Sequence, residues 1–154
     1  MLGRTYDNQL CSIARTLEIV GERWTLLIIR DVQLGLRRFE EFQESLGIAR
    51  NVLTNRLSKL VDDGLLVRVC YQERPARYEY QLTGKGKDLL TAVVSLMHWG
   101  DEHAENPAGP PRIVSHAGCG GDVREQLVCT ECGKAVGQDA ILMLPGPALA
   151  DSPS

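Results

Sequence analysis

Four glycines divide the first 65 residues into short segments whose apolar side chains recur three or four positions apart. These glycines are Gly21, Gly35, Gly47 and Gly64. Glycine is disfavoured inside helices and common just after the last turn, so each one predicts the end of a helix. The apolar spacing between them is that of helices with one buried face. The sequence therefore predicts four short helices, the last of them over about 50–63.

A β-hairpin and a further helix are predicted next. Residues 65–71 and 78–82 are rich in β-branched and aromatic side chains, and they flank a polar, proline-containing loop over 72–77. Thr83 can cap a long helix over roughly 84–103. This order of elements is that of a winged helix-turn-helix domain. We therefore predict an α+β fold, mainly α.

The composition changes after this last helix. Residues 105–111 contain three prolines and a glycine, which cannot continue a helix. The chain ends in small residues and proline, a composition typical of a frayed terminus. The expected parts are a winged-helix domain over 1–105, a linker over 106–111, a second small module over 112–144 that includes an apolar strand over roughly 140–144, and a flexible tail over 145–154.

Composition also excludes several classes of protein. The chain has 154 residues, of which 44% are hydrophobic and 24% charged, close to the average for globular domains. No apolar run approaches the roughly 20 residues that span a bilayer, and the N-terminus lacks the pattern of a secretory signal. We expect a soluble, cytoplasmic protein with no membrane partner. No phosphate loop, nucleophile elbow or open catalytic metal site is recognisable, so we expect no enzyme.

Residues 39–63 have the dimensions of a helix-turn-helix, with a tight turn at 47–49. The leucines of 50–63 share one helical face and polar side chains occupy the other, where amides can read adenine and arginines guanine. Between Arg50 and Lys87 eight Lys or Arg oppose four acids, although the whole chain has a net charge of −3. The alternative is an ordinary solvated face. The residues predicted to contact DNA are Arg38, Arg50, Asn51, Thr54, Asn55, Arg56, Lys59, Arg74 and Arg77.

Ordered motifs also carry a family resemblance. They are Cys11-Ser12-Ile13, the runs 19–31, 53–57, 63–68 and 75–80, and the short pairs Arg38-Phe39, Gly47-Ile48 and Leu82-Thr83, followed by His98-Trp99-Gly100. With these motifs, residues 10–105 closely resemble the HxlR-type winged-helix regulators, bacterial relatives of the MarR group. One departure is Ala49, where many family members have serine. The helix over 50–63, which is the recognition helix of this helix-turn-helix, is therefore expected to lack a side-chain N-cap.

The resemblance implies a homodimeric, sequence-specific regulator that binds a pseudo-palindromic double-stranded operator, and we expect it to be a repressor. Family members pack their first and last helices against those of a partner subunit. The apolar residues that would do so here are Ile13, Leu17, Leu89, Leu90, Val93, Leu96 and Met97. Those of the last helix could instead belong to the core of one subunit.

Cys11 matches a cysteine near the start of the first helix that senses oxidants or electrophiles in several family members. Amides at a helix N-terminus stabilise thiolates in general, which permits such a role. The alternative is a small apolar residue packed under the helix. We accordingly expect an oxidant or a small molecule as effector.

The other cysteines suggest a metal. Five cysteines cannot form a complete disulfide framework, and three of them lie within 14 residues beside a histidine. The runs 116–120 and 129–133 share the pattern of ligand, two residues, cysteine and glycine. Two such knuckles facing each other form a closed tetrahedral site for structural Zn²⁺. The predicted ligands are His116, Cys119, Cys129 and Cys132, so the module over 112–144 is predicted to be a small C-terminal zinc ribbon that completes the α+β fold. The alternative is a flexible tail with reduced, unpaired thiols.

A rival hypothesis is a winged-helix and zinc-ribbon module that binds other proteins without reading DNA. Salt dependence separates the two. Binding to DNA weakens with salt with a log–log slope near −0.9 per phosphate contact, whereas an apolar protein interface shows little such slope.

Overall fold

The computed structural model describes residues 5–6, 9–104 and 106–150. Contacts divide the chain into two compact units, residues 1–93 and 94–154. The division falls inside the last long helix, whereas the sequence predicted a boundary near 105. Residue 105 itself, like 151–154 of the predicted flexible tail, lies outside the described residues. None of the helices in the described part is long and apolar enough to cross a membrane.

The four predicted helices of the first unit are confirmed. They are α1 (Ser12–Val20), α2 (Thr25–Gln33), α3 (Phe39–Leu46) and α4 (Arg50–Asp62). Gly47 closes α3 with a left-handed φ of 61°, a conformation that glycine adopts without strain, and this turn sets α4 against α3. Ala49 precedes α4 and gives it no side-chain cap, as predicted.

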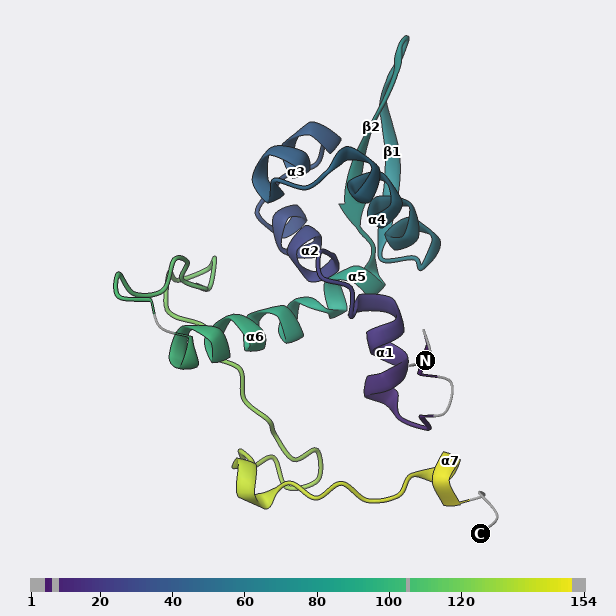
Figure 1. Ribbon diagram of the computed structural model, residues 1–154. Helices are drawn as coiled ribbons and strands as arrows, with labels where there is room; N and C mark the ends of the chain where they lie inside the picture. Colours follow the sequence, from purple (N-terminus) through teal and green to yellow (C-terminus); the bar gives the residue numbers. More distant parts are fainter. Residues whose placement is uncertain (1–4, 7–8, 105, 151–154) are drawn as a thin grey trace. The chain divides into compact units, whose positions relative to one another are not determined.

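The predicted hairpin is confirmed, but its strands are longer than expected. Strand β1 (Leu66–Glu73) pairs antiparallel with β2 (Ala76–Leu82), so the turn is only Arg74–Pro75. The polar residues near the tip join the ladder because this part of the hairpin is exposed, and polar side chains cost little there. A bulge between Cys70 and Gln72 leaves Tyr71 without a partner in the register. The hairpin projects away from α2, α3 and α4 (Figure 1).

The core lies between α2, α3, α4 and the start of β1. Its buried side chains are Val20, Ile28, Val32, Phe42, Ile48, Leu53, Leu57, Leu60, Leu65 and Leu66. The base of the hairpin is fixed to the helices, since the Tyr80 amide donates to the Arg37 carbonyl at 2.8 Å and the Tyr80 ring meets Phe42 edge-on. Helix α4 and the hairpin are therefore held in one rigid arrangement.

The long helix predicted over 84–103 is two helices, α5 (Gly84–Asp88) and α6 (Leu90–His103). Thr83 caps α5 as predicted, because its hydroxyl accepts the Gly86 amide at 3.1 Å. Gly86 lies so close to the core that a Cβ there would approach the Leu65 carbonyl oxygen to 2.2 Å. The first turn is thus pinned to the core. At Leu89 the amide bonds back only three residues, which interrupts the helix.

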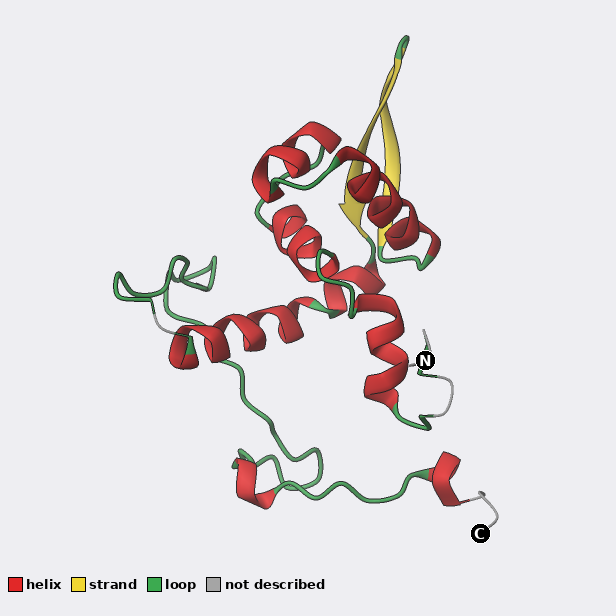
Figure 2. Ribbon diagram, viewed as in Figure 1, coloured by secondary structure: helices red, strands yellow, loops and turns green. Residues whose placement is uncertain are grey.

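The second unit holds the C-terminal part of α6, a 3₁₀ turn η1 (Gln138–Ala140) and a short helix α7 (Pro147–Ala150). Most of the remainder is loop (Figure 2). The strand predicted over 140–144 is wrong: Leu142 and Met143 are exposed, and no described strand pairs with them. An apolar run needs a neighbouring strand before it can join a ladder. Instead, two isolated bridges join Ser115 to Asp122 and Val128 to Ala135.

Candidate nucleic-acid interface

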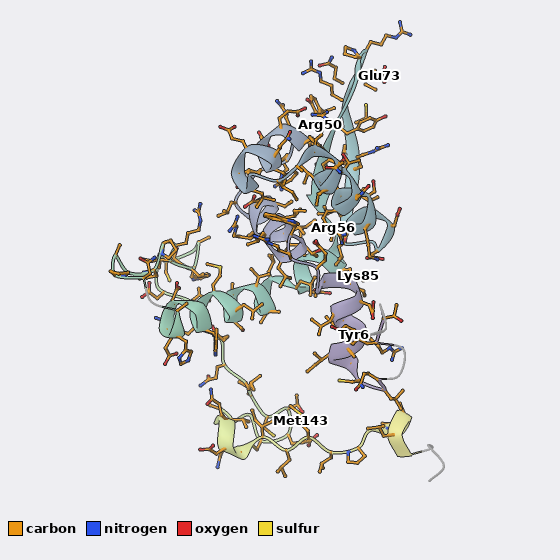
Figure 3. All side chains as sticks on the ribbon, in the orientation of Figure 1. Tyr6, Arg50, Arg56, Glu73, Lys85 and Met143 are labelled. Atoms are coloured by element: carbon orange, nitrogen blue, oxygen red, sulfur yellow. The ribbon has the colours of Figure 1, made fainter. Side chains whose placement is uncertain are left out.

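A groove lies between the first residues of α3, the first residues of α4 and the hairpin. Three arginines predicted to contact DNA line it together, Arg38, Arg50 and Arg77. Figure 3 shows Arg50 at the end of α4 toward the hairpin, with Glu73 at the hairpin tip. The remaining lining residues are aromatic, acidic or small: Phe39, Glu40, Glu41, Tyr71, Ala76, Tyr78 and Tyr80.

Aromatic rings contact two of these three arginines. The guanidinium carbon of Arg38 lies 4.5 Å from the centre of the Tyr71 ring, and that of Arg50 lies 4.7 Å from Phe39. Each such contact contributes about 0.5–1 kcal/mol at an exposed site. These rings were not among the predicted site residues. The available signal was the alternation of tyrosine with basic residues in the hairpin.

Glu41 orders the edge of the groove. Its carboxylate accepts hydrogen bonds from the Arg37 and Arg38 amides at 2.7 and 2.8 Å. These two backbone hydrogen bonds lower the pKa of Glu41 below its usual value of 4.5, and the nearby arginine charges lower it further. The ionised Glu41 thereby caps the start of α3 and fixes the backbone that carries the Arg38 side chain.

Helix α4 exposes the polar residues predicted to face DNA. Asn51, Thr54 and Asn55 are exposed, and the Thr54 hydroxyl donates its proton to the Arg50 carbonyl at 2.9 Å. Thr54 therefore offers a ligand its acceptor lone pairs and its methyl group rather than a donor. Lys59 pairs with Asp63 at 3.0 Å while about half of its side chain stays accessible.

Arg56 differs from the other predicted DNA contacts. Its Nε lies 3.2 Å from a Glu22 carboxylate oxygen, and its side chain is only 23% exposed. Residue 56 directly precedes the buried Leu57, so it borders the buried face of α4. In Figure 3 Arg56 also lies farther from the hairpin tip than Arg50 does. The structure thus gives Arg56 a partner within the domain, and its placement does not support the predicted DNA contact.

The hairpin carries the last two predicted contacts. Arg74 and Arg77 are both exposed, Arg74 in the turn and Arg77 at the start of β2. The Gln72 side-chain amide donates to the Arg74 carbonyl at 3.2 Å, which ties the turn to β1. The two guanidinium groups therefore stand on an ordered arm beside α4.

The residues predicted for the dimer interface separate into two groups. Ile13 and Leu17 of α1 and Leu96 of α6 are exposed, with 64%, 41% and 55% of their surface accessible. Val93 is buried and Leu89 packs against the core. These two residues therefore belong to the core of one subunit, which was the alternative to the dimer interface. Leu90 and Met97 are half-buried. The sequence-based set omitted the exposed Trp99 of α6.

Cys11, the predicted redox sensor, is exposed immediately before α1. Its carbonyl accepts the first hydrogen bond of the helix, from the Arg15 amide at 3.1 Å. An oxidant can therefore reach this thiol without any opening of the fold.

The predicted metal ligands come together as two pairs. The His116 Nδ1 lies 3.3 Å from the Cys119 Sγ. In the second pair the amides of Cys132 and Glu131, together with the Cys132 thiol, donate to Cys129 and lower the pKa of its thiol. Within the described residues no three His, Cys, Asp or Glu side chains are grouped closely enough to hold one ion. The structure forms both pairs and does not join them.

Known proteins resemble the chain over most of its length. Residues 19–108 match the family model described as HxlR-like helix-turn-helix. The chain is 47% identical over 136 residues to the uncharacterized HTH-type transcriptional regulator Rv3095 of Mycobacterium tuberculosis, covering 88% of this chain and 86% of that protein.

Solved structures extend the likeness. PA1607, a candidate transcription factor, is 33% identical and superposes with a TM-score of 0.80 over 92% of this chain and 99% of its own. The redox regulator HypR in its reduced form is 29% identical, with a TM-score of 0.59, over 62% of this chain and 95% of its own.

Proposed function

This chain belongs to the HxlR-like helix-turn-helix family and is a DNA-binding transcriptional regulator, and from that premise we propose that it acts in the cytoplasm as a homodimeric repressor. One observation supports the site most strongly: three arginines meet in a groove between the start of the recognition helix and the hairpin. Positive charge in that groove can follow one strand of phosphates while α4 enters the adjacent major groove.

Two kinds of contact follow from the exposed residues. The side-chain amides of Asn51 and Asn55 read base edges, with Thr54 beside them, because amides can bond adenine through two atoms at once. Arg38, Arg50, Arg74 and Arg77 bind phosphates, together with Lys59 when it leaves Asp63. Base contacts supply specificity, whereas phosphate contacts supply affinity for any sequence.

The test compares one residue of each kind. Asn55→Ala should weaken binding to the operator by about 1–3 kcal/mol and leave binding to random DNA almost unchanged. Arg74→Ala should weaken binding to both DNAs by a similar factor. Fluorescence anisotropy with labelled duplexes measures all four affinities. If both substitutions lowered both affinities equally, this division of roles would be wrong.

Dimerisation is supported by apolar side chains that the chain leaves uncovered. Ile13 and Leu17 are exposed on α1, and Leu96 and Trp99 are exposed on α6. Burial of such side chains in a second subunit would contribute about 25 cal/mol per Å² of apolar surface. Each dimer would present two recognition helices to half-sites about one helical turn apart. Sedimentation should give a dimer for the wild type and a monomer for Leu96→Asp; a monomeric wild type would contradict the dimer.

Cys11 is the proposed sensing residue. It is exposed at the start of α1, next to helix residues assigned to the dimer interface. In an oxidised dimer two Cys11 thiols would form one disulfide, giving two electrons and two protons to an oxidant such as diamide. Diamide should lower operator affinity of the wild type and of Cys70→Ser, but not of Cys11→Ser. An unchanged affinity of the wild type after confirmed oxidation of Cys11 would rule the sensor out.

A further inference from the structure

Two segments of the C-terminal unit have the same backbone hydrogen-bond pattern. In the first knuckle, residues 114–123, the His116 amide donates to the Gly121 carbonyl at 2.8 Å, and the Gly120 amide returns to the His116 carbonyl at 2.7 Å. A third bond, from the Val123 amide to the Val114 carbonyl at 2.9 Å, closes the segment. The first knuckle is thus a small closed hairpin with His116 and Cys119 in its loop.

The second knuckle, residues 127–136, repeats this pattern 13 residues later in the chain. The Cys129 amide donates to Lys134 at 2.9 Å, and the Gly133 amide returns to Cys129 at 2.9 Å. The Val136 amide closes the hairpin on the Leu127 carbonyl, again at 2.9 Å. The glycine that follows Cys119 in the first knuckle and Cys132 in the second has a left-handed φ, 74° at Gly120 and 69° at Gly133. Position by position, His116 corresponds to Cys129 and Cys119 to Cys132.

The first knuckle already holds its two side chains at the separation of metal ligands. With Zn–N and Zn–S bonds of about 2.0 and 2.3 Å, a tetrahedral angle places nitrogen and sulfur roughly 3.5 Å apart. The His116 Nδ1 and the Cys119 Sγ are 3.3 Å apart. Gly118 permits this arrangement, because a Cβ there would come within 2.9 Å of the His116 ring. The loop is therefore shaped around the histidine ring.

We propose that one Zn²⁺ joins the two knuckles through His116, Cys119, Cys129 and Cys132. One imidazole and three thiolates are a ligand set that zinc prefers, and four protein ligands leave no open position, so the ion is structural. Each cysteine releases its proton to solvent as the metal binds. No electron is transferred.

Joining the knuckles requires little change in either of them. Only residues 124–126 lie between the two hairpins, so an extended chain of this length can separate them by at most about 14 Å. We expect closure to come from rotation within this short link, where Glu125 pairs with His98 of α6, and not from a change in the hydrogen bonds of either hairpin.

The apolar surface of the two segments supports this closure. Ile113 directly precedes the first knuckle, and Leu127 and Val128 begin the second; they are 73%, 61% and 53% exposed. Burial of apolar side chains is favourable, so a closure that covered part of this surface would stabilise the joined form.

The experiment measures the metal content and the ligand set of the full-length protein. Purified under reducing conditions, the wild type should contain one zinc per chain. Replacement by Co²⁺ should give the thiolate-to-cobalt charge-transfer bands and the intense d–d bands of a tetrahedral site. Cys119→Ser, Cys129→Ser and Cys132→Ser should each lower zinc affinity more than tenfold, because each removes one ligand. Cys70→Ser removes a thiol from strand β1, which is far from both knuckles in the sequence, and should leave metal content unchanged.

Two further variants separate ligation from a loss of folding. His116→Cys should still bind one ion, with a cobalt spectrum shifted toward four thiolates, whereas His116→Ala should bind weakly. Gly118→Ala should lower affinity by displacing the ring, while Gly137→Ala, where a Cβ meets nothing within 4 Å, should not. A wild type without zinc that gives no cobalt–thiolate bands would overturn the proposal. So would a His116→Ala variant that keeps wild-type affinity and spectrum.

Discussion

Arg38 and Arg50 each lie over an aromatic ring at the edge of the groove, and this contact limits where their charges can stand. A free arginine side chain carries about 2 kcal/mol of rotamer entropy that a bound one loses. Part of that loss is already incurred in the unbound protein. Phosphate binding therefore costs less at these two residues than at a freely moving surface arginine.

Glu41 gives a prediction about pH. Its folded-state pKa is lowered, so its charge stabilises the fold above the unfolded value of about 4.5, and this contribution disappears as the pH falls through the lowered folded value. Glu41→Gln should therefore unfold more easily than the wild type at neutral pH, and the difference should vanish in acid. Urea unfolding at a series of pH values measures it.

Glu44 provides the matched control, since it is exposed on the same helix, α3. Glu44→Gln should change stability little at any pH. A difference between Glu41→Gln and the wild type that persisted unchanged in acid would contradict the role of the Glu41 charge.

At the residue scale, the helical period predicted which side chains of α4 are exposed but not which partners they have in the folded domain. The exposure of Asn51 and Asn55 followed from the helical period of the leucines, because the period fixes which face is buried. The ion pair between Arg56 and Glu22 could not be predicted from the helical period. The long side chain of Arg56 reaches Glu22, a residue 34 positions earlier, and only the packed domain brings the two together.

At the scale of elements, the start of α4 lacks the side-chain cap that helices commonly have. Ala49 has the extended backbone of an N-cap residue, with φ −63° and ψ 139°, but no side-chain oxygen to accept the first free amides. Ala49→Ser should therefore stabilise the protein by about 1 kcal/mol. Unfolding in denaturant measures the gain as a higher midpoint concentration at an unchanged m-value.

Ala49→Val is a useful companion, because valine, like alanine, supplies no acceptor at the cap position. It should not reproduce the gain. If serine and valine changed stability alike, the missing acceptor would not be what limits the start of α4.

Elements were predictable where the signal was local. Glycine ends and apolar periods placed the helices α1 to α4, since these features act within one or two turns. The strand expected over 140–144 failed for the opposite reason. Its apolar residues had the composition of a strand, but pairing depends on a neighbour elsewhere in the chain, and none of the described strands serves. The hairpin turn was overestimated because exposed ladders accept polar residues.

At the scale of the whole molecule, the residues assigned to DNA binding and the two knuckles lie in different units. Residues 1–93 contain the groove, the recognition helix and the core that fixes their geometry. Residues 94–154 contain most of α6 and both knuckles, which the sequence located from the spacing of cysteine and histidine. PA1607 matches 92% of the chain, more than the winged helix alone, so the likeness includes this second unit.

The most direct measurement is the salt dependence of DNA affinity. The wild type should bind both the DNA upstream of its own gene and a random duplex at low salt, with log–log slopes near −0.9 per phosphate contacted. Arg77→Ala should reduce the magnitude of that slope by about one contact, whereas Arg56→Ala, whose partner is Glu22, should leave it unchanged. Absence of salt-sensitive binding to either duplex, or equal slopes for Arg77→Ala and the wild type, would contradict the assignment of this groove to DNA.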